Sequence, residues 1–141
     1  MTTSQPQSAP AVLIVDDEAA NRKLLVQLVE REGFTALEAS GGAEALALLE
    51  SEEVDLVLLD LMMPETDGMT VLRSLQRQGR LPALPVVVVT AYDGRQRRLE
   101  ALSTGAIEFL AKPINHLEVT SLLAVDRQAS KSTWPAAERS Q

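Results

Sequence analysis

Polar side chains that could perform chemistry stand at the ends of four short apolar runs in this sequence. They are Asp16 and Asp17 after residues 11–15, Asp60 after residues 56–59, Thr90 after residues 85–89, and Lys112 after residues 106–110. An ionised carboxylate at the end of a buried run is costly unless it is solvated, paired or bound to a metal. Asp60 directly follows four apolar residues, so it needs such a partner.

These residues supply three carboxylates, one hydroxyl and one ammonium, and a divalent cation, a lysine and a hydroxyl around one carboxylate describe a phosphoryl-transfer site. Neighbouring carboxylates repel one another unless a cation lies among them, and a ligand set made only of oxygens favours Mg²⁺. Lys112 can pair with a carboxylate or an anionic ligand, and Thr90 can donate to an oxyanion. Because catalysis of phosphoryl transfer is mostly positioning and charge neutralisation, we expect Asp60 to be a nucleophile that forms an acyl phosphate.

The elements that must position these side chains alternate between strand and helix. Apolar runs predict five strands, at residues 11–15, 34–39, 56–59, 85–89 and 106–110. Apolar residues at helical spacing follow each strand. This alternation predicts an α/β protein, a doubly wound (βα)5 parallel sheet with helices on both faces. Sites in such sheets form beyond the carboxyl ends of the strands, so the polar side chains should meet at one rim.

Composition excludes several other classes of site and partner. The chain has 141 residues, no cysteine and one histidine, which excludes disulfides, zinc–thiolate sites and two-histidine metal sites. Its net charge of −7 argues against direct nucleic-acid binding. No apolar run is long enough to span a membrane, and the polar start lacks a secretory pattern. We therefore expect a cytoplasmic protein with a disordered arm (1–9), one domain (10–126) and a flexible tail (127–141).

The motifs of this chain, taken in order, resemble those of response-regulator receiver domains of two-component signalling, as in chemotaxis regulators. They are Asp16-Asp17, Asp60 followed by Leu-Met-Met-Pro, Asp67-Gly68, Thr90-Ala91 and Lys112-Pro113. The resemblance implies a flavodoxin-like three-layer sandwich with strand order 2-1-3-4-5. It also implies a phosphorylation-controlled switch, not an enzyme, that receives its phosphoryl group from a histidine kinase or a phosphotransfer protein.

The resemblance assigns a role to each residue of the metal and phosphoryl sites. Asp60 would be the phosphoacceptor. Mg²⁺ would be held by Asp17, Asp60 and the Met62 backbone carbonyl, with Asp16 acting mostly through water. Lys112 would contact a phosphoryl oxygen, and its bond to Pro113 is expected to be cis. The backbone N–H groups of Leu61 and Ala91 would complete the oxyanion cradle.

The resemblance also implies a conformational response. Thr90 would rotate to hydrogen-bond the phosphoryl group, and Phe109 would swing inward as Thr90 moves. The face built from the fourth helix, fifth strand and fifth helix would then change shape for a downstream partner or output domain, or for a second copy of the chain. Arg95, Arg97 and Arg98 form a basic run on this face, where solvated surface charges are favoured over a role in partner binding.

Two residues at the expected mouth of the site suggest a long-lived phosphoryl group. Met62 is large and apolar and Tyr92 is aromatic, so together they could shield an acyl phosphate from water. We therefore expect slow self-dephosphorylation.

Other functions and simpler structural roles compete with this interpretation. A haloacid-dehalogenase-like phosphatase also uses a strand-end aspartate, but it needs a second acid two residues later, where this chain has Met62. A pseudo-receiver would keep the fold without phosphorylation. Asp16 could simply cap the first helix, and Phe109 could be an ordinary core residue.

Overall fold

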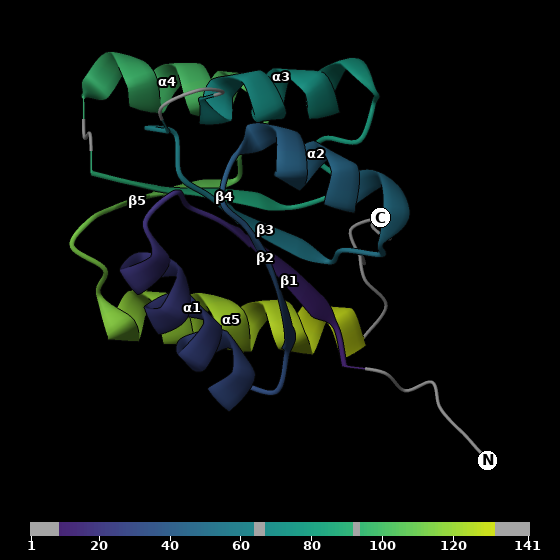
Figure 1. Cartoon of the computed structure of the whole chain (residues 1–141), viewed down its shortest axis with the longest axis vertical. Helices are drawn as coiled ribbons and strands as arrows, with labels where there is room; N and C mark the ends of the chain where they lie inside the picture. Colours follow the sequence, from purple (N-terminus) through teal and green to yellow (C-terminus); the bar gives the residue numbers. More distant parts are fainter. Residues whose placement is uncertain (1–8, 64–66, 92–93, 132–141) are drawn as a thin grey trace.

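The computed structural model describes residues 9–63, 67–91 and 94–131, and within them five strands alternate with five helices (Figure 1). The strands are β1 (Ala11–Val15), β2 (Thr35–Ala39), β3 (Leu56–Leu59), β4 (Val86–Thr90) and β5 (Glu108–Ala111). The helices are α1 (Ala19–Arg31), α2 (Gly42–Ser51), α3 (Gly68–Arg77), α4 (Arg95–Thr104) and α5 (His116–Lys131). The strands form one sheet in the order β2-β1-β3-β4-β5, with every neighbouring pair parallel. The doubly wound α/β fold and the strand order predicted from the sequence are confirmed.

Helices cover both faces of the sheet and give the molecule three layers. In Figure 1, α1 and α5 lie on one face, and α2, α3 and α4 lie on the other. Successive strand residues point to opposite faces of the sheet and so contribute to two separate hydrophobic cores. Ile14 packs toward α1 and α5, while Leu13 packs on the opposite side. β3 and β4 are buried along their whole length. Strands covered on both faces read as continuous apolar runs, which is why they are recognisable in the sequence.

Three strands begin later than their apolar runs suggest, and β4 starts at Val86, one residue after the expected Pro85. Residues 34–39 were expected as a strand, but the Phe34 N–H donates to the Val29 carbonyl at 3.1 Å and so completes the end of α1. Residues 106–110 were expected as the last strand, whereas β5 covers Glu108–Ala111. The Ala106 N–H donates to the Ala101 carbonyl at 3.0 Å, because the chain is still closing α4 at that point. Apolar residues next to a helix end therefore complete the hydrogen bonds of that end, and the strand begins only after them.

The predicted ends of the domain can be compared only in part. Residues 1–8 of the expected arm and 132–141 of the expected tail lie outside the described residues. Within the described part, α5 continues to Lys131, beyond residue 126 where the sequence suggested the domain ends. The Lys112-Pro113 bond is cis, as expected, and Leu81-Pro82 is also cis, which the sequence did not indicate.

Candidate functional site

The carboxyl ends of β1 and β3 bring three carboxylates together. β1 and β3 are adjacent in the sheet, and the Asp60 N–H donates to the Val15 carbonyl at 3.0 Å. This bond sets the residues that follow the two strands side by side. Oxygens of Asp16, Asp17 and Asp60 lie within 4.8 Å of one another. Asp16 and Asp60 are buried and Asp17 is exposed, so the cluster opens to solvent on one side.

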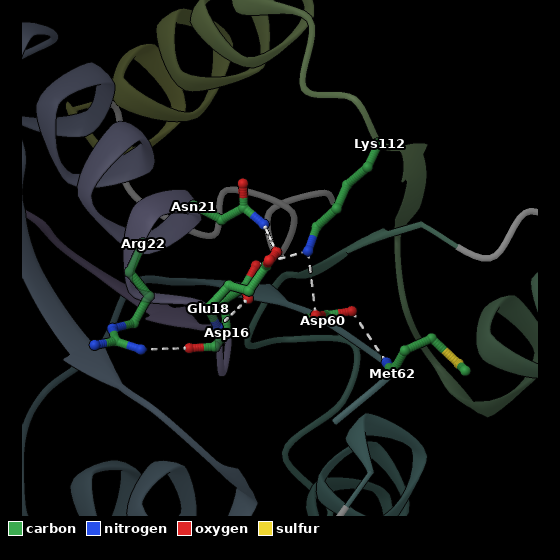
Figure 2. A network of polar contacts seen from close by, with 7 residues as sticks. All are labelled: Asp16, Glu18, Asn21, Arg22, Asp60, Met62 and Lys112. Atoms are coloured by element: carbon green, nitrogen blue, oxygen red, sulfur yellow. Dashed lines mark hydrogen bonds and ion pairs between the residues drawn. The ribbon is translucent and has the colours of Figure 1, made fainter. Parts of the chain in front are cut away.

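Lys112 reaches this cluster from the far end of β5. Its Nζ lies 2.8 Å from Asp16 Oδ2 and 3.2 Å from Asp60 Oδ2 (Figure 2). All three side chains are nearly shielded from water, with 13% of Lys112, 2% of Asp16 and 4% of Asp60 exposed. Three carboxylates and one ammonium leave two negative charges uncompensated, which is the charge that a divalent cation supplies.

Asp60 is held by the loop that follows it. The Met62 N–H donates to Asp60 Oδ1 at 3.0 Å, while Lys112 contacts Oδ2. Burial raises the pKa of Asp60 above its ordinary value of 3.8, and the charge of Asp16 adds to this effect. The Met62 N–H and Lys112 lower the same pKa but do not fully offset burial. The ionised form is therefore undercompensated, and a further cation would stabilise it.

Lys112 stays charged in this environment. Burial is the largest single influence on its pKa and lowers it. The hydrogen bonds and charges of Asp16 and Asp60 together outweigh burial, so the net pKa of Lys112 is raised. An ammonium fixed beside Asp60 can also meet an anion that approaches the same carboxylate.

Asp16 has more partners than the sequence suggested. Its Oδ1 accepts the Glu18 N–H at 2.9 Å, although Glu18, not Asp16, occupies the N-cap position of α1. On the other side of Asp16, Arg22 Nη1 donates to its backbone carbonyl at 2.8 Å (Figure 2). Arg22 was not among the residues predicted from the sequence. A signal existed, since residue 22 shares the spacing of Leu25 and Val29 and so places a cation on the buried stripe of α1.

The other predicted residues of the rim lie near the ends of β3 and β4. Thr90 is fully buried at the end of β4, and its carbonyl accepts the Lys112 N–H at 2.8 Å. Leu61 is fully buried after Asp60, and Ala91 is exposed after Thr90. The structure therefore brings Asp16, Asp17, Asp60 and Lys112 into one cluster, with Thr90 tied to the strand that carries Lys112.

Met62 and Tyr92 were expected at the mouth of the site. Met62 is 47% exposed and lies two residues after Asp60 in the sequence. Tyr92 lies outside the described residues. A phosphatase of the haloacid-dehalogenase type is not favoured, because Met62 supplies only a backbone N–H to Asp60 where that chemistry needs an acid.

Phe109 lies inside the core with a cation above it. Its ring is 4% exposed and packs with the residues between the sheet and α2, α3 and α4. The Arg98 guanidinium of α4 stands 5.4 Å from the ring centroid. This is the geometry of a cation–π contact, and it links α4 to β5 directly. The sequence had placed Arg98 in a basic run on the partner face and did not indicate its contact with Phe109.

Comparison with known proteins places the whole described domain in one family. Residues 12–124 match the family model described as the response regulator receiver domain. The chain is 42% identical over 104 residues to the response regulator PleD of Caulobacter vibrioides, covering 74% of this chain and 23% of PleD. It is 37% identical over 124 residues to the transcriptional regulatory protein ResD of Bacillus subtilis, covering 87% of this chain and 50% of ResD.

A solved structure agrees with the sequence comparison. The response regulator TrrA of Thermotoga maritima, crystallised in complex with Mg²⁺ and BeF, superposes with a TM-score of 0.74 at 29% identity. The match covers 83% of this chain and 98% of TrrA. The chain spans a quarter to a half of the length of PleD and ResD.

Proposed function

The chain belongs to the response regulator receiver domain family of two-component systems, and we propose that it takes a phosphoryl group on Asp60 in a Mg²⁺-dependent reaction. The observation that carries this proposal is the cluster of Asp16, Asp17 and Asp60 with Lys112 at one strand-end rim. Phosphorylation would then switch the surface presented to a partner. The domain regulates; any catalysis is limited to assisting its own phosphorylation and dephosphorylation.

The proposed reaction uses Asp60 as the nucleophile. One carboxylate oxygen attacks the phosphorus of a phosphohistidine, an O–P bond forms, and the P–N bond to the donor histidine breaks. The freed imidazole takes a proton from solvent. The Met62 N–H, 3.0 Å from Oδ1, fixes the orientation of the carboxylate. Lys112 supplies positive charge where the phosphoryl oxygens arrive, and Thr90 and the N–H groups of Leu61 and Ala91 are proposed to donate to those oxygens.

The residues present suit Mg²⁺. We propose Asp17, Asp60 and the Met62 carbonyl as direct ligands, with Asp16 acting through water. Support comes from the all-oxygen donor set, the two uncompensated negative charges and the exposed side of Asp17, where water can complete a hydration shell. When bound, the ion neutralises charge that develops on the phosphoryl group. TrrA, crystallised with Mg²⁺ and BeF, provides a precedent within the same fold.

Thr90 and Phe109 are proposed to transmit the signal. Thr90 ends β4 beside Lys112, and Phe109 lies three residues before Lys112 on β5. A hydrogen bond from the Thr90 hydroxyl to the phosphoryl group would change the packing against Phe109. Because Arg98 stands over the Phe109 ring, a movement of this ring would reach α4. Output would then depend on the difference in partner affinity between the two states.

The partner surface is proposed to be the face of α4, β5 and α5. Leu99, Ile107 and Leu117 are exposed apolar side chains there, at 56%, 46% and 76%. Arg95 on α4 and exposed Glu108 and Glu118 supply charges of opposite sign on the same face. A second copy related by a twofold axis could pair these charges, which supports a homodimer. We propose a histidine kinase or phosphotransfer protein as phosphoryl donor and a protein or output domain as receiver of the signal, with no direct nucleic-acid contact.

The setting of these reactions is proposed to be the cytoplasm. Across the described residues, no helix has the length and apolar character needed to cross a membrane. The proposal rests on the family to which residues 12–124 belong.

The test is intact mass after incubation with acetyl phosphate and Mg²⁺. We expect a gain of one phosphoryl group that is lost in mild base, is absent in EDTA and is absent in the Asp60→Asn variant. Glu53→Gln is a matched control, because Glu53 is an exposed carboxylate before β3, outside the cluster. An adduct that persists in Asp60→Asn would place the phosphoacceptor elsewhere. No adduct from acetyl phosphate, and no binding of beryllofluoride, would favour a pseudo-receiver.

A further inference from the structure

Arg22 stands behind the carboxylate cluster, on the side of Asp16 that faces away from Lys112 (Figure 2). It lies on the first turns of α1, and its guanidinium reaches back to the end of β1. Nη1 donates to the Asp16 carbonyl at 2.8 Å, and Nε donates to Glu38 Oε1 of β2 at 3.2 Å. The Arg22 side chain is 19% exposed, compared with 50% for Glu38. The better buried contact is therefore the one made to Asp16.

The Arg22 contact completes the set of hydrogen bonds around Asp16. The Asp16 N–H donates to the Ala39 carbonyl at 3.1 Å, and its carboxylate is held by the Glu18 N–H and by Lys112. β1 ends at Val15, so the Asp16 carbonyl lies beyond the last regular residue of the strand. Arg22 supplies the donor for that carbonyl. With all its polar groups partnered and 1% of its surface exposed, Asp16 has little freedom to turn its carboxylate away.

We infer that Arg22 is a positioning residue for the cation site, acting through the backbone of Asp16 without touching the ion. This inference rests on the proposed function, because it concerns how well the aspartate cluster holds Mg²⁺. Residues that orient metal ligands from behind commonly change metal affinity by about 10- to 100-fold when they are removed. The same removal would also leave the buried Asp16 carbonyl without a donor among the residues that the structure describes.

The geometry calls for arginine in particular. Two different nitrogens of one planar guanidinium serve two acceptors, the Asp16 carbonyl and the Glu38 carboxylate. A lysine at the same position would present a single nitrogen, which could donate to one of these acceptors at a time. By joining the end of β1 to β2, Arg22 also ties the cation site to the edge strand of the sheet.

The experiment measures the Mg²⁺ dissociation constant by titrating Mg²⁺ alone and following backbone amide shifts near Asp17 and Met62. No phosphodonor is present, so the readout is independent of phosphorylation. We expect Arg22→Met to raise the dissociation constant by about 10-fold. Arg22→Lys should fall between this variant and the wild type, and Glu38→Gln should have a small effect because it leaves the Asp16 contact intact.

Lys23→Met is the matched control for charge. Lys23 is exposed on the same helix, so this variant removes one positive charge without removing the contact to Asp16. A change below about 2-fold is expected for it, since an exposed charge is screened by solvent. If Arg22→Met and Lys23→Met weaken Mg²⁺ binding equally, Arg22 acts through long-range charge and the positioning role is wrong.

Stability and function can be separated within the same set of proteins. Should Arg22→Met fail to fold, Arg22→Lys and Glu38→Gln still test the order of affinities. A folded Arg22→Met protein with wild-type Mg²⁺ affinity would overturn the inference while leaving the proposed function intact. A wild-type protein that takes up neither Mg²⁺ nor a phosphoryl group would overturn the proposed function instead, and the inference with it.

Discussion

Gly68 should not tolerate even one added methyl group. It is the first residue of α3, and its N–H donates to the Leu61 carbonyl at 3.0 Å. A Cβ at this position would lie 2.4 Å from the Asp60 carbonyl oxygen and 2.8 Å from Leu61 Cα. Both atoms belong to the backbone, so no side-chain rotation can relieve the overlap. Gly68→Ala must therefore move α3 away from the segment that carries Asp60.

The size of the effect follows from these distances. Ordinary contact at a Cβ begins near 3.4 Å, so the two segments must separate by about 1 Å. Overpacking of this kind typically costs about 1–3 kcal/mol. Replacing glycine by alanine also lowers the conformational entropy of the unfolded chain, and this offsets about 0.4–1 kcal/mol of the overpacking cost. We expect a net loss of about 1–2 kcal/mol in the free energy of unfolding, and about 10-fold or more in phosphorylation rate, because small displacements of a reacting group are costly.

Urea unfolding followed by circular dichroism, together with the rate of adduct formation from acetyl phosphate, tests both effects. Gly41→Ala is the matched control, because a Cβ at Gly41 meets nothing within 4 Å. It should stay close to the wild type in stability and rate. If Gly68→Ala matched Gly41→Ala in both measurements, the close packing of α3 on the Asp60 loop would be wrong.

Three further outcomes are expected at the site. Burial raises the pKa of Asp60, so above that pKa the ionised carboxylate lowers the free energy of unfolding. At pH 7 in EDTA, we therefore expect Asp60→Asn to unfold at a higher urea concentration than the wild type. That advantage should shrink as pH falls toward the ordinary value of 3.8, and an advantage independent of pH would contradict the burial argument. Mg²⁺ at 100 times its dissociation constant should stabilise the wild type by about 2.7 kcal/mol, reversibly with EDTA; no shift in the melting temperature would count against the cation site. Met62→Asn should shorten the lifetime of the phosphoryl group, as followed by intact mass, and an unchanged lifetime would leave no shielding role for the exposed Met62 side chain.

The fold was predictable because this sheet is buried on both faces. Val86 to Val89 and Leu56 to Leu59 are continuous apolar runs, which is the pattern of strands covered on both faces. The acids after β1 and β3 were recognisable for the same reason, since each follows a buried run. Lys112 follows β5, which is only partly buried, and was recognised as part of the set of strand-end residues. Parallel pairing then placed them on one rim, as the structure shows for Asp16 and Asp60.

Contacts that depend on three-dimensional packing could not be read from the sequence. Arg22 is six residues from Asp16 along the chain, but its second partner, Glu38, is reached only because β2 lies beside β1. The contact of Arg98 with Phe109 depends on how α4 crosses β5. The need for glycine at position 68 depends on a close approach to Asp60 that local propensity does not encode. Strand starts at Thr35 and Glu108 were misplaced because helix caps use the preceding residues.

The hydrogen bond between Lys112 and Asp16 joins residues 96 positions apart. This separation determines when the contact can form during synthesis on the ribosome. Contacts between distant residues form late, because the entropy of closing the intervening loop is lost before the contact is gained. During synthesis, Asp16, Asp17 and Asp60 all emerge before Lys112, so a nascent chain holds the acids without their ammonium. With the roles proposed above for Asp60 and Lys112, competence to receive a phosphoryl group would arise only after the fifth strand has docked. A truncated or partly folded chain would then not be phosphorylated.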